Sequence, residues 1–581
     1  MLRESIRQKR KLNGGEAVLE ALEAEGVKVI YGLPGISTLK IYDALYSKKE
    51  ITHITVKYEA NAAIMADAQG RLTGEPGICL TIAGPGATNT VTAIAEAYDA
   101  ASPVLHISGA ELGDGRYGYF HGMDDPDFLR KIFEPVTKWS HRIEKVEDIP
   151  RDLSRAFKVA RSGRKGPVHI EIPLGVLEAI DLIDPYESQL VPRRDPPEEV
   201  VKELVSLLLK AEMPVIYAGQ GVLRDSASDE LGKLSELLGA PVITTFYESN
   251  VIPHDHPFFA GIVGCRFSRE YLEYEASSPA VANLLEEADV LFSVGIRLGT
   301  PESELLKEIG SKQIIHLDVE ENKFAHEFPI QIEVVSSIKS TLQRLLAALK
   351  GKTLKRKRDV KEEIAEFRRR VKSNLRRIVE EKEKAKPIHP AVAVDKLRKA
   401  LERDAIVISD IGMCQAWLSD FFEVYTPNSY LDPGSYGSMG FALPAAIAAK
   451  VLFPEREVVA VAGDGGFFMS LQEFQTAVEN ELNIVVIVFN DSKYNSLWHI
   501  QKSQYNGRFI AVDMYPANFA KYAETYEVKG IRVEEPSALK QAYEEALSSK
   551  TPTIIDVVID NKYYPIERRA FIKHKRKHIP S

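Results

Sequence analysis

Residues 458–468, VVAVAGDGGFF, and residues 484–492, IVVIVFNDS, decide the fold of this chain. Each stretch begins as an uncharged run of apolar, mostly β-branched residues and ends in polar ones. Runs of this kind are typical of strands buried on both faces, which occur in parallel sheets covered by helices. A helical pattern from Ser470 to Glu479 separates the two runs. This part of the chain therefore predicts a strand–helix–strand unit of an α/β fold.

The same kind of run recurs along the whole chain, with longer helical patterns between the runs. We expect buried strands at residues 27–31, 77–82, 104–107, 168–172, 215–217, 242–244, 290–294, 314–317, 406–408 and 553–558. This alternation predicts an α/β protein with three doubly wound domains, each built on a parallel sheet.

Two breaks suggest where these domains begin and end. Residues 181–200 are rich in proline, which favours an extended linker. Residues 351–388 are densely charged, and their centre, 360–384, is expected to be a solvated connecting helix. We therefore predict domains at 1–182, 196–350 and 389–581, with a charged linker at 351–388.

Composition and charge narrow the class of protein. The 581 residues are 45% hydrophobic and 27% charged, with a formal net charge of −9, so neither a nucleic-acid partner nor a membrane partner is expected. The three cysteines form no close pair, and no secretory signal is visible, which favours a reducing, cytoplasmic location. The basic stretch from Arg568 to Lys577 is interpreted as a solvated or inter-subunit tail.

The ends of the two quoted strands offer a site for a metal ion and a diphosphate. Gly463, Gly465 and Gly466 lie at a strand-to-helix turn, where main-chain N–H groups can approach a phosphate. Asp464 is a hard oxygen ligand at the same turn, and Asn490 ends the next strand. Because parallel strands end on one edge of a sheet, we predict that Asp464, the Asn490 side chain and the Ser492 carbonyl bind Mg²⁺.

This arrangement resembles the thiamine-diphosphate site of the acetolactate synthase and pyruvate decarboxylase superfamily. The chain looks closest to the large, catalytic subunit of acetolactate synthase. Residues 31–35 (YGLPG), 54–63 (ITVKYEANAA) and 81–89 (TIAGPGATN) are similar to the amino-terminal domain of that subunit. The resemblance implies a pyrimidine-binding, a central and a diphosphate-binding domain. It also implies that Glu59 is catalytic and hydrogen-bonds N1′ of the cofactor's aminopyrimidine ring.

The resemblance implies further cofactor contacts. Residues 434–446 resemble the segment that supports the bent cofactor, with Met439 beneath its rings and the Gly437 carbonyl at its 4′-amino group. Residues 409–415 resemble the loop at the diphosphate, although Met413 and Cys414 replace polar residues there. The residues expected to bind the cofactor are Pro34, Gly35, Glu59, Gly84, Asn89, Ile411, Gly412, Met413, Gly437, Met439, Gly463, Asp464, Gly465, Gly466, Asn490, Ser492 and Tyr494.

The substrate pocket departs from the pattern. It is expected to include Ile36, Phe120, His121, Leu497 and Trp498. His121 stands where a glutamine follows the Phe in acetolactate synthase, and a histidine at this position could deliver a proton to the intermediate. Protonation would yield an aldehyde, whereas attack on a second 2-oxo acid would yield an acetohydroxy acid.

The central domain leaves the binding of FAD open. Residues 251–257 and Arg297 resemble a region near FAD in biosynthetic acetolactate synthases, but the acidic residues that should follow Arg297 are missing.

The sequence thus predicts 2-oxo acid decarboxylation with carboligation, as from pyruvate to 2-acetolactate. The alternatives are a decarboxylase or C–C lyase without ligation, and a non-catalytic paralogue. An NAD-binding enzyme is disfavoured, because Gly84-Pro85-Gly86 does not continue as a dinucleotide-binding turn. The resemblance also implies a homodimer or homotetramer, with Glu59 of one subunit facing the Asp464–Asn490 region of another.

Overall fold

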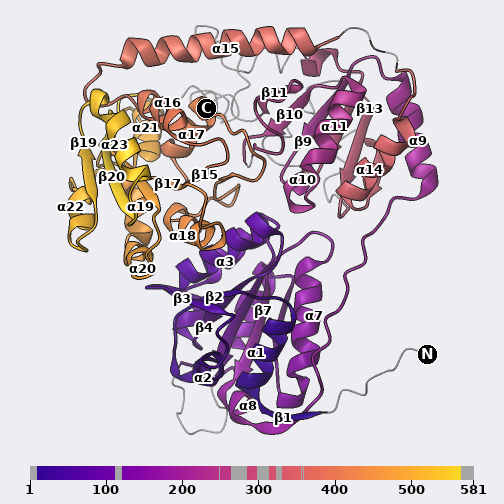
Figure 1. The fold of residues 1–581 in the computed structure, drawn as a ribbon, viewed down its shortest axis with the longest axis vertical. Coiled ribbons are helices and arrows are strands. Elements are labelled where there is room, and N and C mark those ends of the chain that lie inside the picture. Colours follow the sequence, from indigo (N-terminus) through magenta and orange to yellow (C-terminus); the bar gives the residue numbers. More distant parts are fainter. Residues whose placement is uncertain are drawn as a thin grey trace. The chain divides into compact units, whose positions relative to one another are not determined.

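The computed structural model describes residues 9–110, 121–247, 249–263, 284–297, 313–321, 330–354, 356 and 359–563. The chain divides into two compact units. The first consists of Met1–Pro192, Pro433–Leu452 and Ser470–Leu482, and the second of Arg193–Asp432, Phe453–Met469 and Asn483–Ser581. The first contains one parallel sheet and the second contains two, and helices cover these sheets (Figure 1), as predicted from the apolar runs.

The first unit is built on a six-stranded parallel sheet with the strand order β3-β2-β4-β5-β7-β6. Its strands are β2 (Val29–Gly32), β3 (Thr52–Thr55), β4 (Gly77–Thr81), β5 (Val104–Ala110), β6 (Trp139–Arg142) and β7 (Val168–Pro173). A separate two-stranded antiparallel sheet pairs β1 (Arg10–Asn13) with β8 (Ile180–Ile183), so a strand occupies the start of the expected linker.

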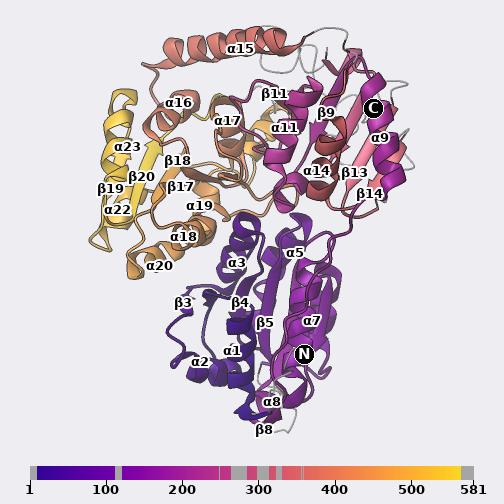
Figure 2. The same cartoon turned by 45° about the vertical axis from the view of Figure 1, so that its right-hand side comes forward.

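Helices cover both faces of this sheet (Figure 2). Side chains of α1 (Gly14–Ala24) and α7 (Ile149–Arg161) form one hydrophobic core with the strands. Two other helices pack against each other, α3 (Glu59–Thr73) and α5 (Val91–Asp99), and α3 also packs on α18 (Ala442–Leu452). The remaining helices are α2 (Leu39–Leu45), α4 (Pro85–Thr88), α6 (Phe128–Phe133), α8 (Leu174–Glu178) and α20 (Glu473–Glu479).

The second unit holds two further six-stranded parallel sheets. The central sheet has the order β11-β10-β9-β12-β13-β14. Its strands are β9 (Pro214–Ala218), β10 (Val242–Thr245), β11 (Phe259–Val263), β12 (Val290–Val294), β13 (Gln313–Asp318) and β14 (Ile330–Val335). Its helices are α9 (Glu198–Lys210), α10 (Gly221–Arg224), α11 (Ser228–Leu238) and α14 (Ile338–Leu349).

The carboxy-terminal sheet has the order β16-β15-β17-β18-β20-β19. Its strands are β15 (Ile406–Ser409), β16 (Tyr430–Leu431), β17 (Val458–Gly463), β18 (Val485–Asn490), β19 (Gly530–Val533) and β20 (Thr553–Val558). Its helices are α16 (Pro390–Ala400), α17 (Met413–Phe421), α19 (Asp464–Ser470), α21 (Asn495–Gln504), α22 (Phe519–Glu524) and α23 (Leu539–Leu547). The three parallel sheets confirm the predicted fold class.

The charged segment after the central sheet contains the helix α15 (Lys361–Lys382), which runs from the central sheet to the carboxy-terminal one (Figure 1). Only Ile364, Phe367 and Val379 of this helix are buried, so most of its charges face solvent, as expected for a connecting helix. Within the described part of the chain, every helix is too short or too polar to span a lipid bilayer.

Candidate functional site

The buried carboxylate of Asp464 joins the ends of two neighbouring strands. Asp464 follows β17, and its Oδ1 accepts a hydrogen bond from the Gly465 N–H at 2.8 Å. Its Oδ2 accepts from the N–H groups of Asp491, at 3.1 Å, and Ser492, at 2.6 Å, just beyond the end of β18. Burial raises the pKa of Asp464 to about 6, which these N–H donors partly oppose. The two strand ends predicted to share a metal ion therefore lie together.

The other two predicted metal ligands flank this carboxylate. The Asn490 amide nitrogen donates to the Ala517 carbonyl and to Asp556, both at 2.9 Å, which leaves the amide oxygen as the atom suited to a cation. Ser492 has a positive φ of 58°, and its carbonyl accepts from the Met514 N–H at 2.9 Å. A carbonyl oxygen has a second lone pair, so this hydrogen bond does not prevent coordination.

A glycine-lined edge lies beside the same strand ends. β15 pairs with β17 in parallel, which places Ile411, Gly412 and Met413 next to the turn after β17. Gly412 has a φ of 124°, and a Cβ added there would meet only the Ser496 hydroxyl, at 4.0 Å. A Cβ added at Gly463 would meet no atom within 4 Å, so the main chain is uncovered at both glycines. The Ser496 hydroxyl is buried and has no hydrogen-bond partner among the described residues, and it lies 4.0 Å from the Cβ position of Gly412.

In the first unit, Glu59 is the first residue of α3 and is almost fully buried. Its Oε2 accepts a hydrogen bond from the Asn89 side chain at 3.0 Å. A Cβ added at Gly86 would lie 3.3 Å from Oε1 of Glu59 and 2.3 Å from Ile82, so the turn after β4 is packed tightly around this carboxylate. The motifs at 54–63 and 81–89 thus meet at Glu59.

The adjoining loops of the first unit are also close together. A Cβ at Gly35 would lie 2.3 Å from the Ile82 side chain, and one at Gly84 would lie 2.5 Å from the His121 carbonyl oxygen. The main chain of His121, which has a positive φ of 63°, is therefore next to the turn that leads to Asn89. Ile36 is half exposed, and Phe120 lies outside the described residues.

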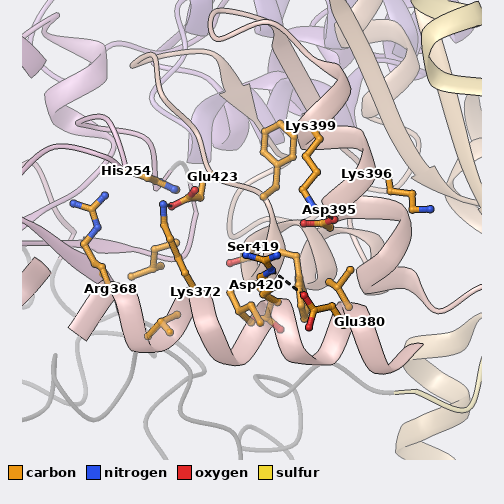
Figure 3. A pocket seen from close by; sticks show the side chains of 18 of the residues that line it. His254, Arg368, Lys372, Glu380, Asp395, Lys396, Lys399, Ser419, Asp420 and Glu423 are labelled. Carbon is orange, nitrogen blue, oxygen red and sulfur yellow. Dashed lines mark hydrogen bonds and ion pairs between the residues drawn. The ribbon is translucent and has the colours of Figure 1, made fainter. Parts of the chain in front are cut away.

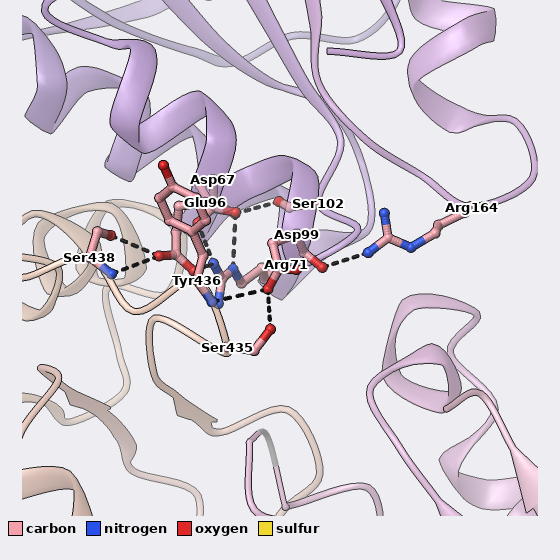
Figure 4. Close-up of polar contacts among 9 residues, drawn as sticks. All are labelled: Asp67, Arg71, Glu96, Asp99, Ser102, Arg164, Ser435, Tyr436 and Ser438. Carbon is pink, nitrogen blue, oxygen red and sulfur yellow. Dashed lines mark hydrogen bonds and ion pairs between the residues drawn. The ribbon is translucent and has the colours of Figure 1, made fainter. Parts of the chain in front are cut away.

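Acidic side chains of α5 hold the loop at residues 433–441, which contains Gly437 and Met439 (Figure 4). The Ser438 N–H and hydroxyl donate to Glu96 Oε2 at 3.0 and 2.8 Å. The Ser435 hydroxyl and the Tyr436 N–H donate to Asp99 Oδ2 at 2.6 and 3.2 Å.

A fully buried charged cluster lies behind this loop. Arg71 donates to both oxygens of Asp67, at 3.0 and 2.6 Å, and lies 3.4 Å from Glu96 Oε1. The Arg71 guanidinium also lies over the Phe441 ring, 4.9 Å from its centroid. Burial raises the pKa of Glu96 to about 7, while Arg71 and Ser438 act to lower it.

Glu473, on α20, is a functional candidate that the sequence did not identify. Its Oε1 accepts hydrogen bonds from the N–H groups of Lys57 and Tyr58 and from the Asn61 side chain, at 2.9, 3.1 and 2.9 Å. These donors surround the start of α3, where Glu59 lies. The buried carboxylate therefore caps the helix that carries Glu59. In sequence, Glu473 is one acid in a helical pattern, and only its position beside the buried Phe474 hinted at burial.

The substrate-pocket prediction for Leu497 and Trp498 stays untested. Both lie on α21, and the Leu497 side chain is half exposed. The Trp498 ring is stacked on Phe509 at 5.0 Å between centroids, and Lys502 lies over it at 4.8 Å. Tyr494 precedes this helix, and its N–H donates to the Val512 carbonyl.

A separate cavity of about 940 Å³ lies beneath α15 (Figure 3). Its charged side chains pair with one another, for example Lys372 with Glu423 at 2.8 Å and Lys396 with Glu383 at 3.4 Å. None of the predicted site residues lines it.

Comparison with known proteins agrees with the geometry. Three family models match: the amino-terminal TPP-binding domain of thiamine pyrophosphate enzymes at residues 12–127, the central domain at 201–345 and the carboxy-terminal TPP-binding domain at 410–557. The chain belongs to the thiamine pyrophosphate enzyme family.

Curated relatives in this family are similar over nearly their whole length. A probable acetolactate synthase large subunit of Methanocaldococcus jannaschii is 34% identical, over 94% of this chain and 92% of the relative. The isozyme 3 large subunit of Escherichia coli is 30% identical, over 96% and 97%. The acetolactate synthase of Bacillus subtilis is 31% identical, over 95% and 94%. The resemblance noted in the sequence is thereby confirmed.

The described residues fit the cofactor of this family, thiamine diphosphate. The uncovered main chain at Gly412 and Gly463 and the unpartnered Ser496 hydroxyl offer N–H and O–H groups to a diphosphate. Within the described residues no cluster of three or more His, Cys, Asp or Glu side chains could hold a metal ion. A cation at this edge would therefore need the Asn490 amide and the Ser492 carbonyl besides Asp464, which is the oxygen-rich set that suits Mg²⁺.

The structure predicts that Glu473→Ala destabilises the protein. The buried Asn61 amide and the partly buried N–H groups of Lys57 and Tyr58 would lose their acceptor, which should lower the free energy of unfolding by roughly 2–4 kcal/mol. Chemical denaturation measures this loss. Glu479→Ala is the matched control, because Glu479 lies on the same helix and pairs with Lys57 at the surface, where little change is expected. Equal stability of Glu473→Ala and wild type would contradict the capping role.

The raised pKa of Glu96 predicts how Glu96→Gln changes the pH dependence of stability. Between the ordinary glutamate pKa of 4.5 and the folded value of about 7, the folded state holds a proton that the unfolded state releases. The wild type should therefore lose stability relative to Glu96→Gln as the pH rises through this window, by roughly 3 kcal/mol in total. Unfolding free energies of both proteins, compared from pH 5 to pH 8, measure the difference. A difference that does not vary with pH would show that Glu96 is not held neutral by burial.

Proposed function

We propose that this protein is a thiamine-diphosphate- and Mg²⁺-dependent enzyme that decarboxylates a 2-oxo acid and ligates the product to a second one. The reaction we favour is the conversion of pyruvate to 2-acetolactate. The observation that carries this proposal is the similarity of almost the whole chain to proteins named acetolactate synthase. The hydrogen bond from Asn89 to the buried Glu59 supports it, because the proposed chemistry needs a carboxyl held at one place.

The side chains have separate tasks in this proposal. Glu59, oriented by Asn89, would share a proton with N1′ of the aminopyrimidine ring. The Gly437 carbonyl would accept a hydrogen bond from the 4′-amino group, and Met439 would support the rings from below. Asp464, the Asn490 amide oxygen and the Ser492 carbonyl would hold Mg²⁺ on the diphosphate. The bound cofactor supplies the carbon nucleophile and stabilises the negative charge as CO₂ leaves.

The glycine-lined edge has the task of holding the diphosphate. N–H groups of Ile411, Gly412 and Met413, together with those of Gly463, Gly465 and Gly466, would donate to its oxygens. Pro34, Gly35, Gly84 and Tyr494 would shape the walls around the cofactor. The substrate would lie among Ile36, Phe120, His121, Leu497 and Trp498.

A second candidate function is decarboxylation without ligation, and the position of His121 favours it. The main chain of His121 lies against Gly84, at the turn that leads to Asn89 and thus to Glu59. An imidazole in this neighbourhood could protonate the intermediate before a second 2-oxo acid reacts.

Three wider features belong to the proposal. The domains would be the pyrimidine-binding domain at 1–182, the central domain at 196–350 and the diphosphate-binding domain at 389–581, with the linker at 351–388. From the family resemblance we propose at least a homodimer, in which Glu59 of one subunit completes the site at the Asp464–Asn490 region of another.

The binding of FAD stays open. Arg297 is exposed, and residues 298–301 lie outside the described residues. The visible absorption spectrum of the purified protein would show whether FAD is bound.

Glu59→Gln should slow exchange of the cofactor's C2 proton by orders of magnitude, because the amide cannot share a proton with N1′. Diphosphate affinity should change little, since the proposal places Glu59 at the other end of the cofactor. Nuclear magnetic resonance measures the exchange, and titration calorimetry measures the affinity. An exchange rate equal to that of the wild type would remove Glu59 from the mechanism.

Incubation with Mg²⁺, thiamine diphosphate and a panel of 2-oxo acids should yield 2-acetolactate from pyruvate, identified by mass spectrometry. Acetaldehyde as the sole product would favour the second candidate function instead. His121→Gln is the matched variant: if His121 delivers a proton, the share of aldehyde among the products should fall in this variant. No turnover of any 2-oxo acid by the Mg²⁺- and cofactor-loaded protein would contradict both functions.

A further inference from the structure

The loop at residues 433–441 is fixed by a carboxylate that neither the family match nor the proposed mechanism assigns. Glu96 is fully buried on α5, and Ser438 supplies two of its hydrogen bonds, through its N–H at 3.0 Å and its hydroxyl at 2.8 Å (Figure 4). Ser438 lies between Gly437 and Met439, the two residues proposed to contact the pyrimidine side of the cofactor.

The planarity of the peptide bond links Glu96 to the Gly437 carbonyl. The Ser438 N–H and the Gly437 C=O belong to the same peptide unit, and in a trans peptide they point in opposite directions. A hydrogen bond that fixes the N–H on Glu96 therefore also fixes the direction of the C=O, away from α5. Gly437 has a φ of 74°, so the chain reaches this orientation through a conformation that a residue with a side chain rarely adopts.

The charged groups around Glu96 make this contact strong. Arg71 donates to both oxygens of Asp67 and also to Glu96 Oε1, at 3.4 Å. A buried carboxyl oxygen without a donor is costly, and the N–H and hydroxyl of Ser438 both donate to the other oxygen, Oε2. Displacing Ser438 would take these two donors from Oε2, which holds the loop in place.

A second acid holds the neighbouring part of the loop. Asp99, one turn further along α5, accepts from the Ser435 hydroxyl and the Tyr436 N–H at 2.6 and 3.2 Å. The same stretch of chain, from Asn89 to Asp99, thus contacts Glu59 at its beginning and the loop at its end. Glu59 and the loop with Gly437, which are proposed to contact the aminopyrimidine ring, are therefore both held by this stretch of chain.

We propose that Glu96 is a positioning residue: by anchoring the Ser438 N–H, it aims the Gly437 carbonyl at the 4′-amino group of the cofactor. This inference rests on the proposed function, because it assumes that thiamine diphosphate binds with its ring at Gly437. Glu96 itself contacts neither substrate nor cofactor in this account.

The test compares Glu96→Met, which fills the space but accepts no hydrogen bond, with Glu96→Gln, which keeps an acceptor oxygen. In the cofactor-free protein, Glu96→Met should lower the protection of the Ser438 amide against hydrogen exchange by about tenfold or more. With Mg²⁺ and thiamine diphosphate bound, it should slow C2-proton exchange by roughly tenfold to hundredfold, because a misplacement of about 1 Å is enough for such a loss. Glu96→Gln should restore most of both values.

Glu171→Gln is the matched control. Glu171 is also a buried acid of the first unit, paired with Arg142 at 2.9 Å and with a pKa raised by burial to about 7, but it lies on β7, and its ion pairs among the described residues do not involve the loop. It should leave the Ser438 protection and the C2 exchange at wild-type values, which separates positioning from general loss of a buried charge.

The outcomes separate the two claims. A wild-type protein that does not accelerate C2 exchange would overturn the proposed function. A folded Glu96→Met protein with wild-type C2 exchange would overturn the positioning role alone. If Glu96→Met does not fold, Glu96→Asp decides: it keeps the carboxyl group but withdraws the acceptor from the Ser438 N–H by one methylene. A several-fold slower C2 exchange in Glu96→Asp supports the inference, and a wild-type rate contradicts it.

Discussion

The carboxylate of Asp464 accepts hydrogen bonds from the N–H groups of Asp491 and Ser492, which lie 27 and 28 residues further along the chain. This interaction fixes the edge of the carboxy-terminal sheet, because it ties the end of β17 to the residues that follow β18. It also supplies the buried carboxylate with N–H donors, which offset the cost of burying it. The Asn490 amide and the Ser492 carbonyl take their places from the same strand ends.

The segments proposed to hold the pyrimidine side of the cofactor depend on buried acids in a similar way. Asn89 orients Glu59, Glu473 caps the helix on which Glu59 lies, and Glu96 holds the loop that contains Gly437. Each of these contacts joins a helix or turn to a segment that carries proposed cofactor residues. Buried carboxylates are costly unless they are fully hydrogen-bonded, so these groups tolerate little movement of the segments that they hold. That rigidity is what a site needs when it must orient a cofactor rather than react itself.

The sequence predicted the fold well where strands are long and apolar. The runs at 104–107, 458–461 and 484–489 became β5, β17 and β18 because buried parallel strands have few alternatives. The short edge strand β16, with the sequence YL, lacks such a run and was not foreseen. The connecting helix was predicted at 360–384 from the pattern of charges alone, and the structure has it at Lys361–Lys382.

The local motifs around Glu59 and Asp464 were visible because glycines and acids at strand ends have a recognisable spacing. Glu473 and Glu96 were not, because what makes them important is a contact with residues more than 300 positions away, at Tyr58 and Ser438. In sequence each is one more acid in an amphipathic helix. His121 was predicted from the sequence as a residue of the substrate pocket, and the structure adds that its main chain lies beside Gly84.

The central proposal is that Glu59 and Asp464 serve one cofactor, with the two residues contributed by different subunits. The most direct measurement mixes two inactive variants, Glu59→Gln and Asp464→Ala, under conditions that allow subunits to exchange. If each site combines Glu59 of one subunit with Asp464 of its partner, mixed dimers contain one intact site and about a quarter of the wild-type activity should return. If both residues act within one chain, every site in the mixture keeps a defect, and the absence of any recovered activity would contradict the account.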